Sequence, residues 1–111
     1  MVPAPSEQHG DVRRLVLDAA IAIIELEGAE SLSMREVARR AGVSHQAPYH
    51  YFSDRSGIFA AISEEGFTGL AQALRDVHET EMPAAKAGFI AYLNFSRQHV
   101  GHIRVMFRND I

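Results

Sequence analysis

Apolar residues recur with the spacing of an α-helix through almost the whole chain, and no segment of useful length alternates as a strand would. Over residues 11–27 they fall at i, i+3, i+4 and i+7, on one helical face: Val12, Leu15, Val16, Ala19, Ile23 and Ile24. Gly28 follows and suits the position just past a helix C-terminus. The chain is therefore predicted to be all-α.

Length and composition narrow the class of protein further. The 111 residues are 47% hydrophobic and 23% charged, which is typical of a folded domain with a modest core. Cysteine is absent, so disulfides and thiolate chemistry are excluded for this sequence. The longest apolar run, Ala19–Ile24, is far shorter than the ~20 residues of a membrane span. Because the N-terminus also lacks a secretory pattern, we expect a cytoplasmic chain with no membrane partner.

Proline, glycine and capping residues predict where the remaining segments begin. Residues 1–9 contain two prolines and few apolar side chains, and are predicted to be a flexible N-terminal arm. Five further helices are expected, beginning at or just after Ser33, Ser44, Asp54, Pro83 and Val100.

Residues 33–52 carry the pattern of a helix-turn-helix motif. Ser33 and Glu36 form a capping box, in which the Ser33 hydroxyl accepts from the Glu36 N–H and the Glu36 carboxylate reaches back. Gly42 ends this short helix, and Ser44 is the predicted N-cap of the next. In such a pair the second helix enters the DNA major groove with its first residues at the base edges.

The charge distribution agrees with a phosphate-binding surface at this motif. The net charge is −3, yet residues 31–56 carry +2, so the remainder of the chain carries −5. The positive charges come from arginines: Arg35, Arg39, Arg40 and Arg55. A basic segment in an acidic chain is a local electrostatic signature of nucleic-acid binding.

The residues of this region resemble a known family. Leu32-Ser-Met-Arg-Glu-Val-Ala-Arg-Arg-Ala-Gly-Val-Ser44, followed by Tyr49-His-Tyr-Phe-Ser-Asp-Arg55 and Ile58-Phe59, strongly resembles the TetR family of bacterial transcriptional regulators, over about residues 12–65. Two residues depart from the usual pattern. Pro48 replaces a small or aliphatic residue, and would be the fourth residue of an irregular recognition helix, while Tyr51 replaces the common histidine.

The resemblance places four residues at the groove-facing start of the recognition helix, where we expect base contacts: Ser44, His45, Gln46 and Ala47. Gln46 can pair with adenine N6 and N7, and Ala47 can touch a thymine methyl. His45 can donate to guanine or a phosphate, the alternative being a solvated surface position.

Phosphate contacts are expected from Ser33, Tyr49, His50 and Arg55. For Ser33 the alternative is a capping role alone, and for Tyr49 it is a packing role. For His50, a contact with the DNA backbone and no contact at all are equally expected. Arg55 stands where the family usually has lysine, at a helix N-terminus that suits an anion, with a solvated arginine as the alternative. Capping is expected from Ser33, Glu36 and Asp54, and Tyr51 and Phe52 are expected in the core.

The resemblance also implies an organisation and a mechanism. Residues 10–54 would form the helix-turn-helix DNA-binding domain, and residues 55–111 a linking helix with part of a ligand-binding and dimerisation domain. Family members resembling this chain are homodimers that bind palindromic double-stranded operators, and most are repressors released by a small effector. We expect the effector site to lie mostly outside this chain, which we interpret as a fragment or as a chain whose apolar faces pair with a second copy.

Two other classes of function compete with this interpretation. A helical protein-interaction module could keep the fold without DNA binding, although the arginines and the Ser44–Tyr49 surface argue against it. An enzyme could use His99 and His102, which are spaced i, i+3, but no third ligand or catalytic motif accompanies them. We therefore expect no catalytic residues, no metal and no cofactor.

Overall fold

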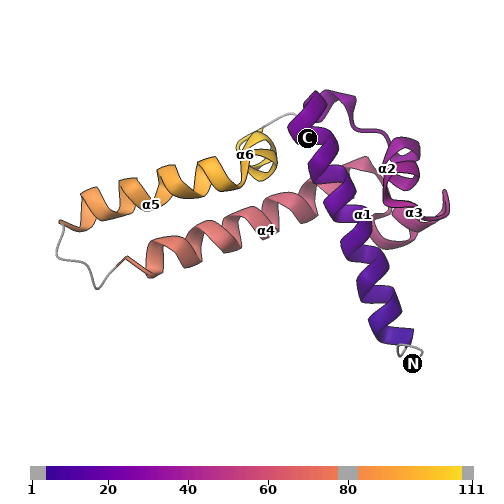
Figure 1. Cartoon of the computed structure of the whole chain (residues 1–111), viewed down its shortest axis with the longest axis horizontal. Coiled ribbons are helices and arrows are strands. Elements are labelled where there is room, and N and C mark those ends of the chain that lie inside the picture. The colour runs from indigo at the N-terminus through magenta and orange to yellow at the C-terminus, as the bar shows by residue number, and fades with distance from the viewer. Residues whose placement is uncertain (1–4, 78–82, 109–111) are drawn as a thin grey trace.

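The computed structural model describes residues 5–77 and 83–108, with the backbone alone described for residues 5–9. Every regular element in these ranges is a helix: α1 (Pro5–Glu27), the 3₁₀ turn η1 (Ala29–Ser31), α2 (Met34–Ala41), α3 (Ala47–Phe52), α4 (Arg55–Arg75), α5 (Ala84–Gln98) and α6 (Val100–Met106). The all-α prediction is confirmed. Figure 1 shows α2 and α3 gathered beside α1, whereas α4 and α5 extend away from it as a pair.

The start of α1 corrects the predicted N-terminal arm. The helix begins at Pro5, so residues 5–9 are helical rather than an arm, and residues 1–4 lie outside the described part. Proline is favoured in a first helical turn, because its missing N–H has no helical acceptor there and its φ is already set.

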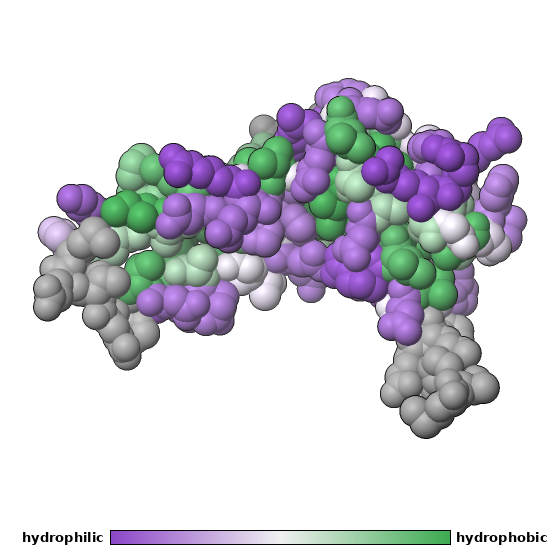
Figure 2. Space-filling view, viewed as in Figure 1, coloured by the Kyte–Doolittle hydropathy of each residue, from purple (hydrophilic) through white to green (hydrophobic). Residues whose placement is uncertain are grey.

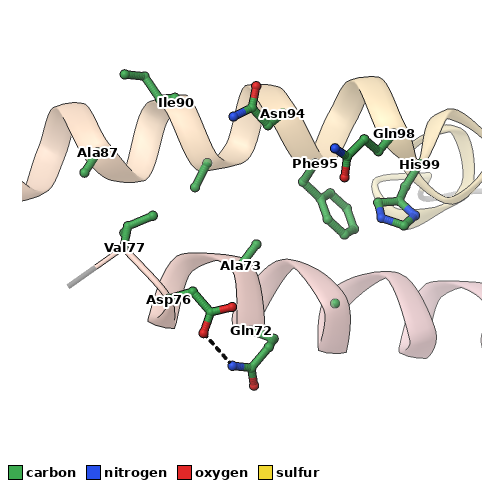
Figure 3. A pocket seen from close by; sticks show the side chains of 12 residues that line it. Gln72, Ala73, Asp76, Val77, Ala87, Ile90, Asn94, Phe95, Gln98 and His99 are labelled. Carbon is green, nitrogen blue, oxygen red and sulfur yellow. Dashed lines mark hydrogen bonds between the residues drawn. The ribbon is translucent and has the colours of Figure 1, made fainter. Parts of the chain in front are cut away.

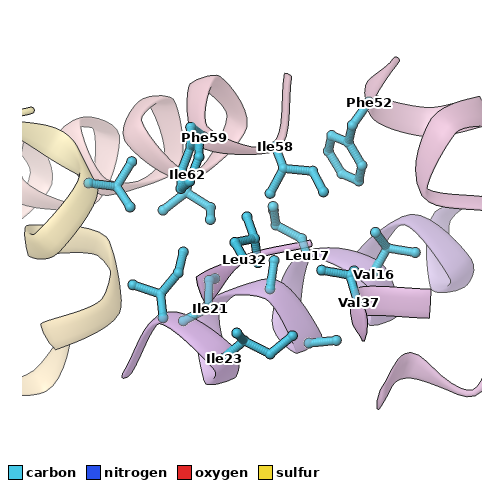
Figure 4. Packing of buried hydrophobic residues seen from close by; sticks show 14 of the residues in the cluster. Val16, Leu17, Ile21, Ile23, Leu32, Val37, Phe52, Ile58, Phe59 and Ile62 are labelled. Atoms are coloured by element: carbon cyan, nitrogen blue, oxygen red, sulfur yellow. The ribbon is translucent and has the colours of Figure 1, made fainter. Parts of the chain in front are cut away.

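One hydrophobic core joins α1 to α2, α3, the first half of α4 and Val105 of α6. Its side chains point toward one another from these helices and from Leu32 in the connection before α2 (Figure 4). The largest fully buried members are aliphatic: Val16, Leu17, Ile23, Ile24, Val37, Ile58, Ile62 and Val105. This core fixes how α2 and α3 are presented.

The second half of α4 packs against α5 and α6 around a smaller cluster of Leu70, Phe95 and Met106. The approach of α6 to α4 depends on Gly66, since a Cβ there would lie 2.5 Å from Met106 Sδ. None of the helices in the described ranges is long and apolar enough to cross a membrane.

Polar contacts connect α6 to the helix-turn-helix end. The Arg104 side chain donates to the carbonyl oxygens of Ile24 (2.9 Å) and Glu25 (3.2 Å), near the C-terminus of α1. These carbonyls belong to the last turn of α1, where the Ile24 carbonyl also accepts from the Gly28 N–H at 2.9 Å. The orientation of α6 is thereby tied to α1.

Candidate nucleic-acid interface

The N-terminus of α2 is capped as the sequence predicted, but from one side only. The Ser33 side chain accepts from the Glu36 N–H at 3.1 Å. The carboxylate of Glu36 turns forward to the guanidinium of Arg39 instead of back to the Ser33 N–H, with an Arg39 Nε to Oε2 distance of 2.9 Å. The hydrogen bond from Arg39 lowers the pKa of Glu36. The predicted capping role of Glu36 is therefore wrong, because an arginine one turn ahead competes for its carboxylate.

The turn between α2 and α3 follows from Gly42. Its φ of 71° lies in the left-handed region that favours glycine. The Gly42 N–H donates to Arg39 O (3.2 Å), and the Val43 N–H donates to Ala38 O (3.1 Å). This is the Schellman arrangement, which satisfies the last carbonyls of a helix and redirects the chain.

The recognition helix α3 begins two residues later than predicted, at Ala47 rather than His45. Ser44 is not its N-cap, since the Ala47 N–H donates to the Ser44 carbonyl across a turn and the helix ladder starts with His50 N–H to Gln46 O. Pro48 explains the delay, because a proline has no N–H to offer the carbonyl four residues earlier and its ring crowds that carbonyl. Pro48 is thus the second helical residue, and the prediction that it would be the fourth is wrong.

The six residues of α3 divide into a buried face and an exposed face. Pro48 and Phe52 are buried, while Tyr51 is half-buried against the core. The exposed side holds Tyr49, which is 50% exposed, and His50. The turn before α3 exposes the side chains of Ser44, His45 and Gln46, and Ala47 is half-buried. The structure therefore brings these base-contact and phosphate-contact candidates together on one edge, with Ser33 exposed at the start of α2.

The corner between α3 and α4 is unusually tight. Ser53 has φ 67° and ψ −53°, and the Asp54 N–H donates to Phe52 O at 2.7 Å, which is a γ-turn with positive φ. Asp54 then caps α4 as predicted, accepting from the Gly57 N–H at 2.9 Å. A Cβ on Gly57 would lie 1.7 Å from the Phe52 carbonyl oxygen, so the corner requires a glycine at this position.

The structure gives Arg55 a structural role, and the phosphate contact expected of this residue stays a prediction. Its guanidinium donates to the carbonyl oxygens of Leu32 and Ala29, both at 2.8 Å, and lies over the Phe59 ring at 4.8 Å. Those carbonyls belong to η1 and the connection into α2, and the Ala29 carbonyl also accepts from the Leu32 N–H at 3.2 Å. Arg55 therefore ties α4 to the connection between α1 and α2. Its partners lie 23 and 26 residues away, so local sequence gave no signal for them.

One basic residue near α3 was missed by the sequence analysis. The guanidinium of Arg13, on α1, lies 5.0 Å from the centre of the Phe52 ring at the end of α3. The Arg13 side chain is exposed, as are Arg35 and Arg40 on α2. The only signal in the sequence is an arginine pair at the polar start of the first helix, which does not reveal that α1 passes beside α3.

Of the histidine pair considered for an enzyme, His102 is buried and His99 is half-buried. The rings of His99 and His102 meet edge to face with centroids 5.5 Å apart, and His102 Nε2 lies 2.8 Å from Glu65 Oε1. Within the described ranges, no group of three or more potential ligands is arranged to hold a metal ion.

This geometry defines a helix-turn-helix protein of the DNA-binding type, with a capped first helix, a glycine turn and a short second helix exposed on one face. Residues 16–62 match the family described as "Bacterial regulatory proteins, tetR family". Residues 16–62, which include the helix-turn-helix, therefore belong to the TetR family of transcriptional regulators.

Curated relatives agree with this assignment. The chain is similar to the HTH-type transcriptional regulator AcrR of Shigella flexneri, with 33% identity over 64 residues that cover 58% of this chain and 30% of the relative. It is similar to the HTH-type transcriptional regulator BetI of Brucella anthropi, with 32% identity over 85 residues (76% of this chain, 44% of the relative). The nucleoid occlusion factor SlmA of Actinobacillus pleuropneumoniae is 26% identical over 109 residues (95% and 54%). The chain thus spans between about a third and about half of these relatives.

Proposed function

We propose that this chain reads double-stranded DNA through the turn before α3 and the exposed side of α3, as part of a ligand-responsive TetR-type repressor. The observation that carries the proposal is the division of this segment into two faces. Pro48 and Phe52 anchor α3 in the core, whereas Ser44, His45, Gln46 and Tyr49 face solvent and have no structural task that requires their polar groups to point outward.

Individual side chains fit distinct parts of a duplex. In the turn that would enter the major groove, Gln46 supplies the amide that pairs with adenine, His45 supplies a donor, and Ser44 a hydroxyl. Ala47, half-buried at the helix start, can offer only its methyl group to a thymine. These four positions are the proposed base contacts.

The proposed phosphate contacts flank the base contacts. The exposed hydroxyl of Tyr49 and the imidazole of His50 can donate to phosphate oxygens from α3. Ser33 uses its oxygen to accept from Glu36, which leaves its O–H free to donate at the start of α2. Arg13, Arg35 and Arg40 supply exposed positive charge around this edge.

A dimer follows from the proposed mode of reading. One short helix meets few base pairs, and a two-fold pair of such helices about one DNA turn apart, ~34–36 Å, matches a palindromic operator. The family resemblance supports a homodimer, a repressor role and release by a small effector. It also supports the division into a DNA-binding domain of residues 10–54 and a ligand-binding and dimerisation part that begins in residues 55–111.

Fluorescence anisotropy with DNA from upstream of the protein's own gene tests the proposal, with a scrambled duplex as control and a salt series. We expect tighter binding to the native duplex and a steep loss of affinity with salt, because phosphate contacts release counterions. Absence of binding to both duplexes at low salt would overturn the proposal in favour of a helical protein-interaction module.

Two matched variants separate base reading from phosphate binding. Gln46→Ala should relax the preference at one base step, at a cost of ~1–3 kcal/mol on the preferred base alone. Tyr49→Phe removes one hydroxyl and should weaken binding to all duplexes by a similar factor. An unchanged base preference in Gln46→Ala would remove this residue from the reading surface, and selective loss in Tyr49→Phe would contradict a phosphate contact.

A further inference from the structure

The recognition segment, residues 44–53, has no permanent positive charge of its own, because it contains neither lysine nor arginine. The side chains in it that can become positive are the imidazoles of His45, in the turn before α3, and His50, on α3. Both are exposed, on the edge that carries Gln46 and Tyr49. A segment proposed to meet a polyanion therefore depends on histidine for any charge of its own.

Some of the arginines around this segment are committed to other partners. Arg39 is paired with Glu36, with 2.9 Å between Nε and Oε2. Arg55 donates to backbone carbonyl oxygens in and after η1. Arg35 and Arg40 are exposed on α2, and Arg13 is exposed on α1. The arginine charge that can meet a duplex at this edge is therefore modest, and one or two further cations would be a large addition to it.

Three helices, α1, α2 and α4, pack against α3 and carry charges of both signs at this end of the molecule. By helix, the titratable and charged groups are Asp11, Arg13 and Arg14 on α1, Arg35, Glu36, Arg39 and Arg40 on α2, and Asp54 and Arg55 at the start of α4, with Tyr49 and Tyr51 on α3 itself. The carboxylate of Asp54 accepts from the Gly57 N–H as a helix cap, and that of Glu36 is bonded to Arg39. Both carboxylates are thus engaged within the chain, so the main anion offered to a charged imidazole here is a phosphate of DNA.

The two histidines lie on either side of the proposed base contacts. His45 comes directly before Gln46, the residue proposed to pair with adenine. His50 lies in the last turn of α3, where the C-terminal end of a helix favours a cation. The His50 ring meets the half-buried Tyr51 ring edge to face, with centroids 4.8 Å apart. This contact braces the imidazole on the exposed side of the helix.

Imidazole is the side-chain group whose charge ordinarily changes between pH 5 and 8. A nearby phosphate stabilises the charged form, and a hydrogen bond from a charged N–H to a phosphate oxygen is about twice as strong as a neutral one. An imidazole that meets phosphate therefore takes a proton from the buffer onto its ring nitrogen as the complex forms. By linkage, the affinity for DNA then rises as the pH falls.

We propose that His45 and His50 are the cations of the recognition segment, and that DNA binding by this chain takes up protons. Each ring gains one proton from the buffer. The His50 imidazolium then pairs with a phosphate oxygen, and the His45 imidazolium with a phosphate oxygen or the acceptor edge of a guanine. This inference rests on the proposed function, because it concerns the same DNA-reading surface, and it adds regulation of that surface by pH.

Fluorescence anisotropy at pH 6, 7 and 8 and constant low salt tests the inference, with the duplex from upstream of the protein's own gene and a scrambled duplex. We expect both duplexes to bind about 10-fold more tightly at pH 6 than at pH 8, since one proton taken up changes affinity by up to about 10-fold per pH unit. Equal affinity at the two pH values, or weaker binding at pH 6, would overturn the inference.

The salt dependence gives a second measurement, which a change in folding would not imitate. The slope of log K against log salt should be steeper at pH 6 than at pH 8, by about one for each histidine that pairs with phosphate. The same slope at both pH values would overturn the pairing of the histidines with phosphate.

Glutamine variants identify the residues that titrate. The double variant His45→Gln and His50→Gln keeps amide donors at two exposed positions but cannot carry charge, so it should bind equally well at pH 6 and pH 8. His99→Gln is the control and should keep the pH dependence, because His99 lies at the end of α5 in the wall of a cavity of about 480 Å³ between α4 and α5 (Figure 3). Circular dichroism at both pH values checks that the variants are folded. Persistence of the pH dependence in the double variant, or its loss in His99→Gln, would overturn the assignment.

Calorimetry counts the protons on the unaltered chain. The heat of DNA binding at pH 7 should differ between phosphate buffer and Tris buffer, because the two buffers release a proton with different heats of ionisation. The direction of the difference should correspond to proton uptake. Equal heats in the two buffers would overturn the inference without any substitution.

Failure of this inference is distinct from failure of the proposed function. A chain that prefers its own upstream DNA, with the same affinity at pH 6 and pH 8, would remain a DNA-binding regulator and lose the proton uptake. A chain that binds both duplexes alike, and more tightly at pH 6, would keep the histidine cations and lose sequence-specific reading. Absence of binding to either duplex at pH 6 and low salt would overturn both.

Discussion

The helix-turn-helix region (residues 5–62) and the distal region (residues 63–77 and 83–108) are both helical but use their apolar side chains differently. The first buries a continuous set of aliphatic residues, several of them with no exposed area, such as Ile24, Val37 and Ile58. The distal region buries a small cluster and leaves large side chains in solvent, with Phe89 63% and Phe107 56% exposed. Figure 2 shows hydrophobic residues on the surface over the α4–α5 end and also over the helix-turn-helix end, and Leu26 of α1 is 69% exposed.

The difference fits the two tasks of the proposed function. A densely packed core holds α3 in a fixed position, which base reading requires. The distal region keeps space between its helices, which a ligand requires. The two regions are joined by Val105 of α6, which is buried in the first core, and by polar contacts that reach from α6 and α4 to α1. The polar contacts run through Arg104 and through the chain of Arg14, Glu65 and His102.

Truncating one side chain in each region tests the contrast most directly. Ile58→Ala should lower the free energy of unfolding by about 2–5 kcal/mol, since Ile58 has no exposed area in the core. Phe89→Ala should change it by about 0.5 kcal/mol or less, because the ring is mostly in solvent. Urea denaturation measures both. A comparable loss in the two variants would show that the distal region is packed as tightly as the first.

Two glycines test the corner that positions α3. Gly57→Ala should destabilise the chain by about 3 kcal/mol, because its Cβ would collide with the backbone of Phe52. Gly10→Ala, where a Cβ would meet nothing within 4 Å, should stabilise α1 by up to about 1 kcal/mol. Thermal unfolding followed by circular dichroism gives both values, and a neutral Gly57→Ala would contradict the tight corner.

Arg55→Lys distinguishes a structural tie from a phosphate contact. A lysine keeps the charge but cannot bridge the carbonyls of Ala29 and Leu32, so we expect a loss of about 1–3 kcal/mol in unfolding free energy. Arg40→Lys, at an exposed position on α2, is the control and should leave stability unchanged. Unaltered stability of Arg55→Lys with weaker DNA binding would favour the phosphate contact over the structural tie.

The smallest effect is expected at the polar link between the regions. Arg14 hydrogen bonds lower the pKa of Glu65 from its ordinary value near 4.5. The folded chain therefore binds this proton less readily than the unfolded chain, so the stabilisation is present above pH ~4.5 and is lost as pH falls through the folded pKa. Because the Glu65 side chain is 37% exposed, screening should keep the effect below about 1 kcal/mol.

Glu65→Gln should remove this part of the acid dependence of stability, measured by urea denaturation from pH 6 down to about pH 3. Glu64→Gln, the exposed neighbouring residue, is the control. An identical pH dependence in the unaltered chain and Glu65→Gln would mean that the Arg14 pair contributes nothing to joining the regions.

Local patterns in the sequence predicted the features that depend on neighbouring residues. The helical spacing of apolar residues identified the helices, and the caps at Ser33 and Asp54 depend on groups only three residues away. The start of α3 was misplaced because a good capping residue, Ser44, competes with the backbone restriction imposed by Pro48. At this helix start the restriction imposed by Pro48 outweighs the capping preference of Ser44.

Features that depend on distant residues could not be predicted in this way. Arg55 finds its acceptors in η1 and beyond, and His102 meets Glu65 from 37 residues away. Nothing in the order of residues reveals which helix ends lie together. The burial of Phe52 on α3 was predicted correctly, because this residue is part of the local pattern of the motif.

The short length of α3 has a consequence for how such a protein can change. Its orientation comes from Pro48, Phe52 and the γ-turn at Ser53, all on the inner side or at the end of the helix. The side chains of His45, Gln46 and Tyr49 on the outer side contribute little to holding it there. These outer positions can therefore be exchanged for other residues with little cost in folding, so that a new DNA target is reachable by a few substitutions on an unaltered scaffold.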